Sequence, residues 1–157
     1  MEIRKFKDTD YEYIKNSWIN TDRLRGIEFP ADYDEYIALT EKWNSGKYNG
    51  KYFDQFVISD GSELTGVASL YEQTENSASI GVIIDKNHYR KGYCSFACNE
   101  LVKLAKDRGF DTICAGVAEN NLPSLEFCKK FGFTEVGRIV NTKGRKQVQF
   151  VKKINKD

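Results

Sequence analysis

Basic residues and a glycine gather in one short stretch, residues 85–94, which we call the basic segment. It reads Asp-Lys-Asn-His-Tyr-Arg-Lys-Gly-Tyr-Cys and lies between an apolar run and an amphipathic run. If a helix begins after Gly92, its unpaired N–H groups and partial positive charge can face an anion, and Arg90 and Lys91 add full charges. Glycine also lets the backbone approach a ligand closely. The combination suits a phosphate or pyrophosphate, although a solvated basic turn has the same composition.

The elements on either side must position this segment. Residues 92–108 predict the clearest helix, because apolar residues recur at steps of three and four and Gly109 suits the position after the last turn. Before the basic segment, the apolar run 80–84 predicts a strand buried on both faces. Gly81 within this run indicates either a bulge or a ligand lying against the strand, or only packing.

Residues 112–117 predict a strand directly after that helix, so that strand 77–85, the helix and strand 112–117 form a β-α-β crossover with parallel strands. The other expected elements are strands at 3–6, 52–59, 64–71, 133–140 and 147–154, and helices beginning near Asp8 and spanning 34–43 and 121–132. The order β-α-α-β-β-β-α-β-α-β-β predicts an α/β (α+β) fold around a mixed sheet of about seven strands.

Length and charge limit the partners. The 157 residues suit one domain, residues 1–157, and 24 Lys and Arg against 23 Asp and Glu leave a net charge of +1. A nearly neutral chain lacks the field that non-specific binding to nucleic acid or anionic membranes requires. No apolar stretch is long enough to span a bilayer, and the first residues lack an apolar signal core. We therefore expect a cytoplasmic protein with a small or local partner.

The cysteines predict thiols rather than a metal site. The chain has four cysteines and one histidine, with no CxxC pair. Cys94 and Cys98 are spaced for one helix face, but His88 alone cannot complete a ligand set with them. We expect no metal and mostly buried, reduced cysteines.

A second motif resembles a known family. An Asn, a small residue three positions later, an amphipathic helix and a Gly-Phe pair leading into a strand occur at Asn121, Ser124, Gly132 and Phe133. Together with the basic segment, they resemble the GCN5-related N-acetyltransferase (GNAT) superfamily, which has the same element order. The resemblance covers nearly the whole chain, most firmly residues 64–140. It is closest to the branch of ribosomal-protein alanine, spermidine and amino-sugar N-acetyltransferases.

The resemblance implies acetyl-CoA as cosubstrate, in a V-shaped cleft between the fourth and fifth strands. Its pantetheine amides would bind the backbone of Val82, Ile83 and Ile84, and Asn121 would contact the same arm. Its pyrophosphate would lie on the basic segment, at Tyr89, Arg90, Lys91, Gly92, Tyr93 and Cys94.

Two positions depart from the family's pattern. Tyr89 stands where an amide or guanidinium is usual, so Arg90 or His88 would take its part. Cys128 stands where many members have a Tyr that protonates the leaving thiolate. Cys128 is therefore either the acid or a packing residue on its helix.

The expected mechanism, also by resemblance, is direct attack by a primary amine of a small molecule or a protein N-terminus. The amine needs a base to remove its proton. Ser79 stands near the place of a family glutamate, which leaves Glu72, and second Glu119, as candidates unless both are only solvated carboxylates.

The acceptor would be selected by residues 21–34 and the final hairpin. Tyr33 and Tyr36 could stack on an acceptor or belong to the core. The replacements at Ser79 and Cys128 also allow a non-catalytic acyl-CoA-binding regulatory module. An exposed strand near the C-terminus makes a homodimer a further candidate assembly.

Overall fold

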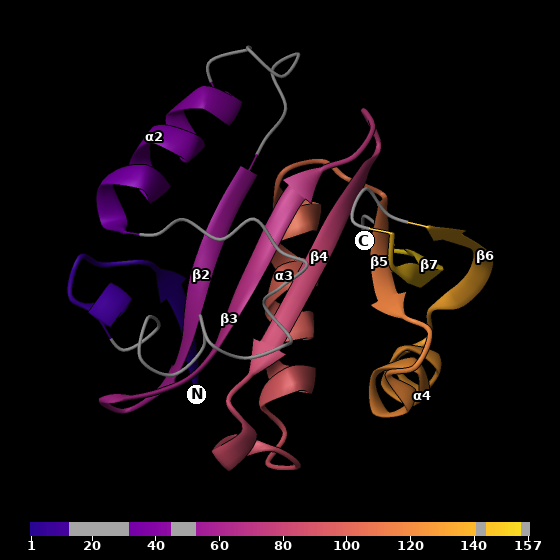
Figure 1. Cartoon of the computed structure of the whole chain (residues 1–157). Helices are drawn as coiled ribbons and strands as arrows, with labels where there is room; N and C mark the ends of the chain where they lie inside the picture. Colours follow the sequence, from indigo (N-terminus) through magenta and orange to yellow (C-terminus); the bar gives the residue numbers. More distant parts are fainter. Residues whose placement is uncertain (13–31, 45–52, 141–143, 155–157) are drawn as a thin grey trace.

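A mixed seven-stranded sheet organises the chain, which was analysed as a computed structural model (Figure 1). The structure describes residues 1–12, 32–44, 53–140 and 144–154. The strands are β1 (Glu2–Lys5), β2 (Phe53–Asp60), β3 (Glu63–Glu72), β4 (Ser77–Ile84), β5 (Thr112–Ala118), β6 (Thr134–Val140) and β7 (Lys146–Lys153). The helices are α2 (Tyr33–Asn44), a 3-10 helix (Lys86–His88), α3 (Tyr93–Asp107) and α4 (Leu122–Phe131).

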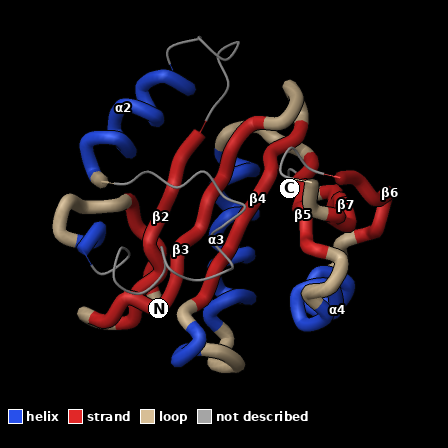
Figure 2. Tube along the Cα trace, viewed as in Figure 1, coloured by secondary structure: helices blue, strands red, loops and turns tan. Residues whose placement is uncertain are grey.

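The sheet order is β1-β2-β3-β4-β5-β7-β6, and β4 with β5 is the parallel pair. The alternation of strands and helices along the chain (Figure 2) confirms the predicted fold class and the β-α-β crossover through α3. Of the helix expected near Asp8, only residues 10–12 fall in the described part, where they are helical. None of the described helices is long and apolar enough to cross a membrane.

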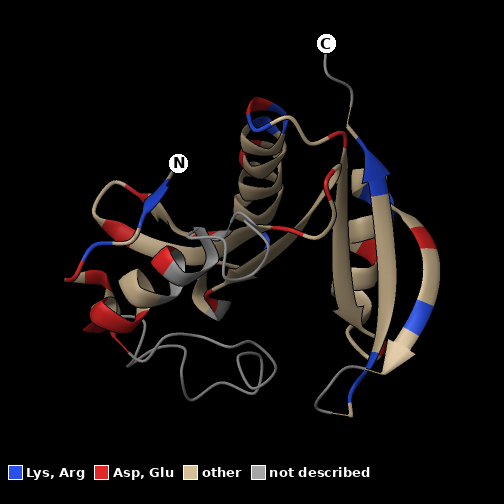
Figure 3. Ribbon diagram, turned by 90° about the horizontal axis from the view of Figure 1, so that it is seen from above, with Lys and Arg blue, Asp and Glu red and all other residues tan. Residues whose placement is uncertain are grey.

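The two faces of the sheet carry different cores. On one face α3 buries a mixed aliphatic and aromatic cluster, with Ala97, Leu101 and Ile113 fully inaccessible to solvent. On the other face α2 covers an aromatic cluster of Phe6, Tyr11, Tyr33 and Tyr36, whose neighbouring rings lie 5.2–6.3 Å apart. Figures 1 and 3 show α2 and α3 on opposite sides of the sheet.

Tyr33 and Tyr36 therefore belong to the core. Tyr36 is only 3% exposed, and its hydroxyl donates a hydrogen bond to Asp54 Oδ1 at 2.9 Å. A phenol held in this way supports the packing of α2 on β2, and its ring face is not available for stacking on an acceptor.

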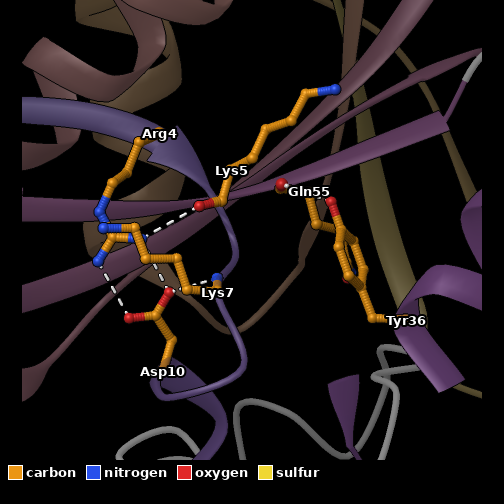
Figure 4. A network of polar contacts seen from close by, with 6 residues as sticks. All are labelled: Arg4, Lys5, Lys7, Asp10, Tyr36 and Gln55. Atoms are coloured by element: carbon orange, nitrogen blue, oxygen red, sulfur yellow. Dashed lines mark hydrogen bonds and ion pairs between the residues drawn. The ribbon is translucent and has the colours of Figure 1, made fainter. Parts of the chain in front are cut away.

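The N-terminal strand is fastened by an ion pair (Figure 4). Arg4 donates to both carboxylate oxygens of Asp10, at 2.8 and 3.0 Å, and the backbone N–H of Lys7 donates to the same carboxylate at 2.7 Å. Asp10 is 5% exposed. A buried carboxylate with three donors holds the turn between β1 and the helical residues 10–12.

Glycines end the two helices α3 and α4. Gly109 and Gly132 follow α3 and α4 in the left-handed region, with φ of 88° and 101°. Lys152 of β7 donates to the carbonyl oxygen of Phe131 at 2.6 Å and lies 4.4 Å from the centre of its ring. The C-terminus of α4 is thereby fixed to the sheet.

Strands β4 and β5 pair at only three positions and then separate. The pairs are Ser77 with Thr112, Ala78 with Ile113 and Ser79 with Cys114, whereas β4 stays paired with β3 up to Ile84. On its other edge β5 stays paired with β7 up to Ala118. The sheet thus opens into the V that was expected between the fourth and fifth strands.

This opening corrects the expectation that strand 80–84 is buried on both faces. Gly81, Val82 and Ile83 are only partly buried, because β5 no longer lies beside them. The register between β3 and β4 runs without a shift past Gly81, so Gly81 does not mark a bulge.

Candidate functional site

The basic segment connects the open end of the V to α3. Asp85 follows β4, and its Oδ1 accepts a hydrogen bond from the Asn87 N–H at 3.0 Å, which starts the 3-10 helix. The chain then turns through Arg90 and Gly92, with φ of 62° and 86°. A left-handed conformation at Arg90 costs about 1 kcal/mol. Such strain is common in loops that bind ligands.

The N-terminus of α3 has no side-chain cap and no acidic residue in its first turn. Arg90, Lys91 and Gly92 are all exposed, and no acidic side chain of the described ranges pairs with either cation. A Cβ atom added to Gly92 would meet nothing closer than Met1 Cε at 3.9 Å. Open backbone, free cations and an uncapped helix therefore meet at one point, which suits an anion.

The second helix beside the opening starts differently. α4 follows the end of β5, and Asn121 Oδ1 accepts a hydrogen bond from the Ser124 N–H at 3.4 Å as the N-cap. The amide NH₂ of Asn121 forms no bond to another described residue. Asn121 thus offers donors at the β5 side of the open end, opposite the basic segment.

Two side-chain contacts that the sequence did not predict hold the basic segment. The Tyr93 hydroxyl donates to Asp60 Oδ2 at 3.0 Å, and His88 Nε2 lies 2.9 Å from Glu63 Oε1. The rings of His88 and Tyr93 meet edge to face at 5.8 Å. Asp60 and Glu63 flank the turn between β2 and β3, so this turn supports the segment from one side. The hydrogen bond to Asp60 also raises the pKa of Tyr93.

His88 does not join Arg90 and Lys91 at the exposed surface. It is 8% exposed and turned toward Glu63, and its Nδ1 is buried without a partner in the described ranges. The expectation that His88 could take the part of the missing amide at Tyr89 is therefore wrong for this arrangement. Tyr89 itself is 37% exposed.

Three thiols meet below the basic segment. Cys94 lies on the first turn of α3, and a hydrogen bond with Cys98 lowers its pKa despite its burial. The same hydrogen bond, together with burial, raises the pKa of Cys98. Burial, and then the nearby Cys94, raise the pKa of Cys128 to about 11. All four cysteines are free thiols, as expected.

The candidate carboxylates lie at opposite ends of the V. Glu72 is the last residue of β3 and pairs with Ala78, at the end where β4 and β5 are still joined. Glu119 follows β5 at the open end, with Oε2 at 3.6 Å from a guanidinium nitrogen of Arg138. Ser79 is 7% exposed on β4. Glu119, rather than Glu72, therefore shares the open end with the basic segment.

A sequence profile described as an acetyltransferase (GNAT) domain matches residues 1–134. The chain belongs to the GNAT acetyltransferase family. The uncharacterized N-acetyltransferase YjdG of Bacillus subtilis is 32% identical over 133 residues, which are 81% of this chain and 72% of that protein. The family profile and this relative together show that the chain is an N-acetyltransferase.

Solved GNAT structures share its fold. A point mutant of the spermidine N-acetyltransferase SpeG from Vibrio cholerae superposes with a TM-score of 0.72 at 21% identity, over 97% of this chain and 92% of that one. The protein yncA from Salmonella typhimurium, whose structure was solved with acetyl-CoA, gives a TM-score of 0.71 at 18% identity, over 99% of this chain and 95% of that one.

Proposed function

We propose that this GNAT domain transfers an acetyl group from acetyl-CoA to a primary amine. The observation that carries the proposal is the opening between β4 and β5, which leads to the uncapped N-terminus of α3. From Ile80 to Ile84 the edge of β4 that faces β5 has no strand partner. Its peptide groups can therefore bind the amides of a pantetheine arm, at Val82, Ile83 and Ile84.

Acetyl-CoA supplies the acetyl group as a thioester, and residues of the chain hold its anionic end. Arg90 and Lys91 carry the charge, and the N–H groups at Tyr93 and Cys94 complete a cradle that Gly92 keeps open. Tyr89 borders this cradle. The amide donors of Asn121, which bond to no other residue that the structure describes, serve the pantetheine arm from the β5 side.

The amine must lose a proton before it attacks, so a nearby carboxylate has to accept it. Glu72 and Glu119 are the candidates: Glu72 lies at the end where β4 and β5 are joined, and Glu119 follows β5 at the open end, beside Arg138. Cys128 keeps its proton at neutral pH because its pKa is about 11. It could thus donate that proton, but it is 6% exposed and packs in the α3 core, which favours a packing role.

The acceptor is a small-molecule amine or the amine of a protein N-terminus, and the four free thiols fit a cytoplasmic location. We also propose a homodimer through β6. All seven residues of this edge strand are exposed, with Val136 at 61% and Val140 at 62%. Antiparallel pairing of two β6 strands would satisfy the open peptide groups of this edge.

Acetyl-CoA turnover with a panel of primary amines tests the proposed activity. Release of free CoA that depends on the amine, with acetylated product found by mass spectrometry, is the expected result. A non-catalytic acyl-CoA-binding module, which the N-acetyltransferase relatives do not favour, would bind acetyl-CoA and release no CoA with any amine. That outcome would overturn the catalytic assignment and leave the binding site standing.

A further inference from the structure

Two glycines face each other across the opening of the sheet. Ser79 and Cys114 are the last paired residues of β4 and β5. Two positions further on, on the same face of each strand, stand Gly81 and Gly116. On the face that these glycines share, neither edge of the opening therefore carries a side chain just beyond the last pair.

Neutral polar groups lie directly over both glycines. A Cβ atom added to Gly81 would lie 2.8 Å from Ser69 Oγ. A Cβ atom added to Gly116 would lie 3.1 Å from Gln147 Oε1 and 3.3 Å from Gln149 Nε2. Side chains from β3 and β7 thus occupy the space that the glycines leave, one strand away from the opening on each side.

A fourth polar group extends the row on β2. Gln55 pairs with Ser69, which in turn pairs with Gly81. Gln55 is 4% exposed, and its Oε1 is buried without a hydrogen-bond partner in the described part of the chain. The side chains of Ser69, Gln147 and Gln149 likewise form no hydrogen bond with the described residues. Within the described part of the chain, the donors and acceptors of Ser69, Gln147 and Gln149 are therefore unengaged, and Gln55 Oε1 is a buried acceptor that lacks a donor.

These groups lie on the face opposite α3. On β4 and β5, Ile80 and Ala115 belong to the core under α3, so the alternating positions Gly81 and Gly116 face the other way. Ile83 and Val67 pack on the aromatic cluster of the α2 side. If the pyrophosphate lies at the N-terminus of α3, an amine has to reach the opening from this α2 side.

The α2 side of the sheet is uncharged around the opening. By strand alternation, the positions that share this side beside the opening are uncharged; they are Gln55, Val57, Val67, Ser69, Tyr71, Ser79, Gly81, Ile83, Cys114, Gly116, Ala118, Gln147, Gln149 and Val151. Lys153 of β7 lies on the same side, but at the closed end of the V, where it pairs with Thr112. A polycationic acceptor bound on this side would have no carboxylate beside most of its positive charges. The hydroxyl and amide groups of a neutral acceptor could instead form hydrogen bonds with the Ser and Gln side chains.

We infer that Gln55, Ser69, Gln147 and Gln149 select the acceptor, and that the acceptor is a primary amine that also carries hydroxyl or amide groups. This inference rests on the proposed function, because it assigns the amine to the α2 side of the same opening. The polar row fixes the orientation of the amine through uncharged hydrogen bonds, and the two glycines allow the polar ends of Ser69, Gln147 and Gln149 to reach the edges of the opening.

The test compares glucosamine with cyclohexylamine, which has the same ring size without hydroxyls, and with spermidine as a polycation. Initial rates are corrected for the fraction of free amine at the assay pH. We expect kcat/KM for glucosamine to exceed the other two by about tenfold or more. In Gln149→Leu and Ser69→Ala, the KM for glucosamine should rise about fivefold, with the KM for acetyl-CoA unchanged. Gln73→Leu, in the exposed turn after β3, is the matched control.

Binding of the three amines to the enzyme saturated with CoA, measured by calorimetry, gives a readout that does not need turnover. Preferred binding of glucosamine that is lost in Gln149→Leu supports the inference even without turnover. Equal or better use of spermidine, or an unchanged glucosamine KM in both variants, would overturn it while leaving the acetyltransferase assignment intact. Failure of every amine to be acetylated would instead count against the proposed function.

Discussion

The Tyr93 hydroxyl donates a hydrogen bond of 3.0 Å to Asp60, a residue 33 positions earlier in the chain. Tyr93 is the first residue of α3, and Asp60 is the last residue of β2. The pair His88 and Glu63, at 2.9 Å, runs beside it. The turn between β2 and β3 therefore sets the position of the basic segment, although it contributes no group to the anion cradle itself.

Loss of this support should weaken acetyl-CoA binding without changing the chemical step. In Glu63→Ala we expect the KM for acetyl-CoA to rise about fivefold and kcat to stay within about twofold, because a positioning contact of roughly 1 kcal/mol is lost. Glu63→Gln, which keeps a hydrogen-bonding oxygen for His88, should restore most of the affinity. Glu75→Ala, in the exposed turn at the other end of β3, is the control. Equal KM values for the alanine variant and the wild type would refute the positioning role.

The thiol of Cys94 should lose its proton at a lower pH than the thiols of Cys98 and Cys128. The hydrogen bond with Cys98 lowers the pKa of Cys94, and only the thiolate is alkylated. The pH midpoint for iodoacetamide reaction at Cys94 should therefore rise in Cys98→Ala, followed site by site by mass spectrometry. Cys114, whose pKa burial raises, serves as the internal reference. An unmoved midpoint would show that Cys98 does not stabilise the thiolate.

Replacing Cys128 separates packing from acid catalysis. For a packing residue, Cys128→Ala should lower the free energy of unfolding by about 1 kcal/mol and leave kcat within about twofold. For a general acid, kcat should fall by about a hundredfold or more at constant KM. We expect the first result, because Cys128 lies in the α3 core at 6% exposure.

The ion pair of Arg4 and Asp10 should appear in the acid stability of the protein. Burial acts to raise the pKa of Asp10, but the hydrogen bonds from Arg4 and from the Lys7 N–H outweigh it and lower the pKa below 3.8. A lowered folded-state pKa stabilises the fold above pH 3.8, and this contribution is lost as the pH falls through the lower value.

Asp10→Asn should accordingly cost about 2 kcal/mol of unfolding free energy at pH 7, measured with urea. Its deficit against the wild type should shrink below pH 4. Asp8→Asn, at an exposed neighbour, should change neither value appreciably. A deficit that stays constant down to pH 2.5 would contradict the titration of Asp10.

Local pattern was enough to predict α3 and most of the fold. The apolar period after Gly92 and the glycine at 109 predicted α3 to within a residue at each end, because both depend on neighbouring positions. Glycine at position 92 was likewise expected to let a ligand approach the backbone closely, and Gly92 has open space beside it.

The support of the segment and the acceptor face depend on tertiary register and were not predicted. Glu63 and His88 are 25 positions apart, and no period connects them. The same holds for Gly81 and Gly116, which lie opposite each other only because of the register that pairs Ser79 with Cys114. The exposure of Gly81, Val82 and Ile83 was missed for the same reason, because an apolar run does not reveal that a neighbouring strand leaves.

Calorimetric titration of acetyl-CoA into Gly92→Glu tests the central claim most directly. The substitution puts bulk and negative charge on the open backbone before α3, and we expect affinity to fall at least about a hundredfold. Gly109→Glu is the matched control, since Gly109 also has a positive φ with open space around it but lies at the other end of α3. Thermal unfolding of both variants shows that each is folded. Wild-type affinity in Gly92→Glu would contradict the assignment of the anion site.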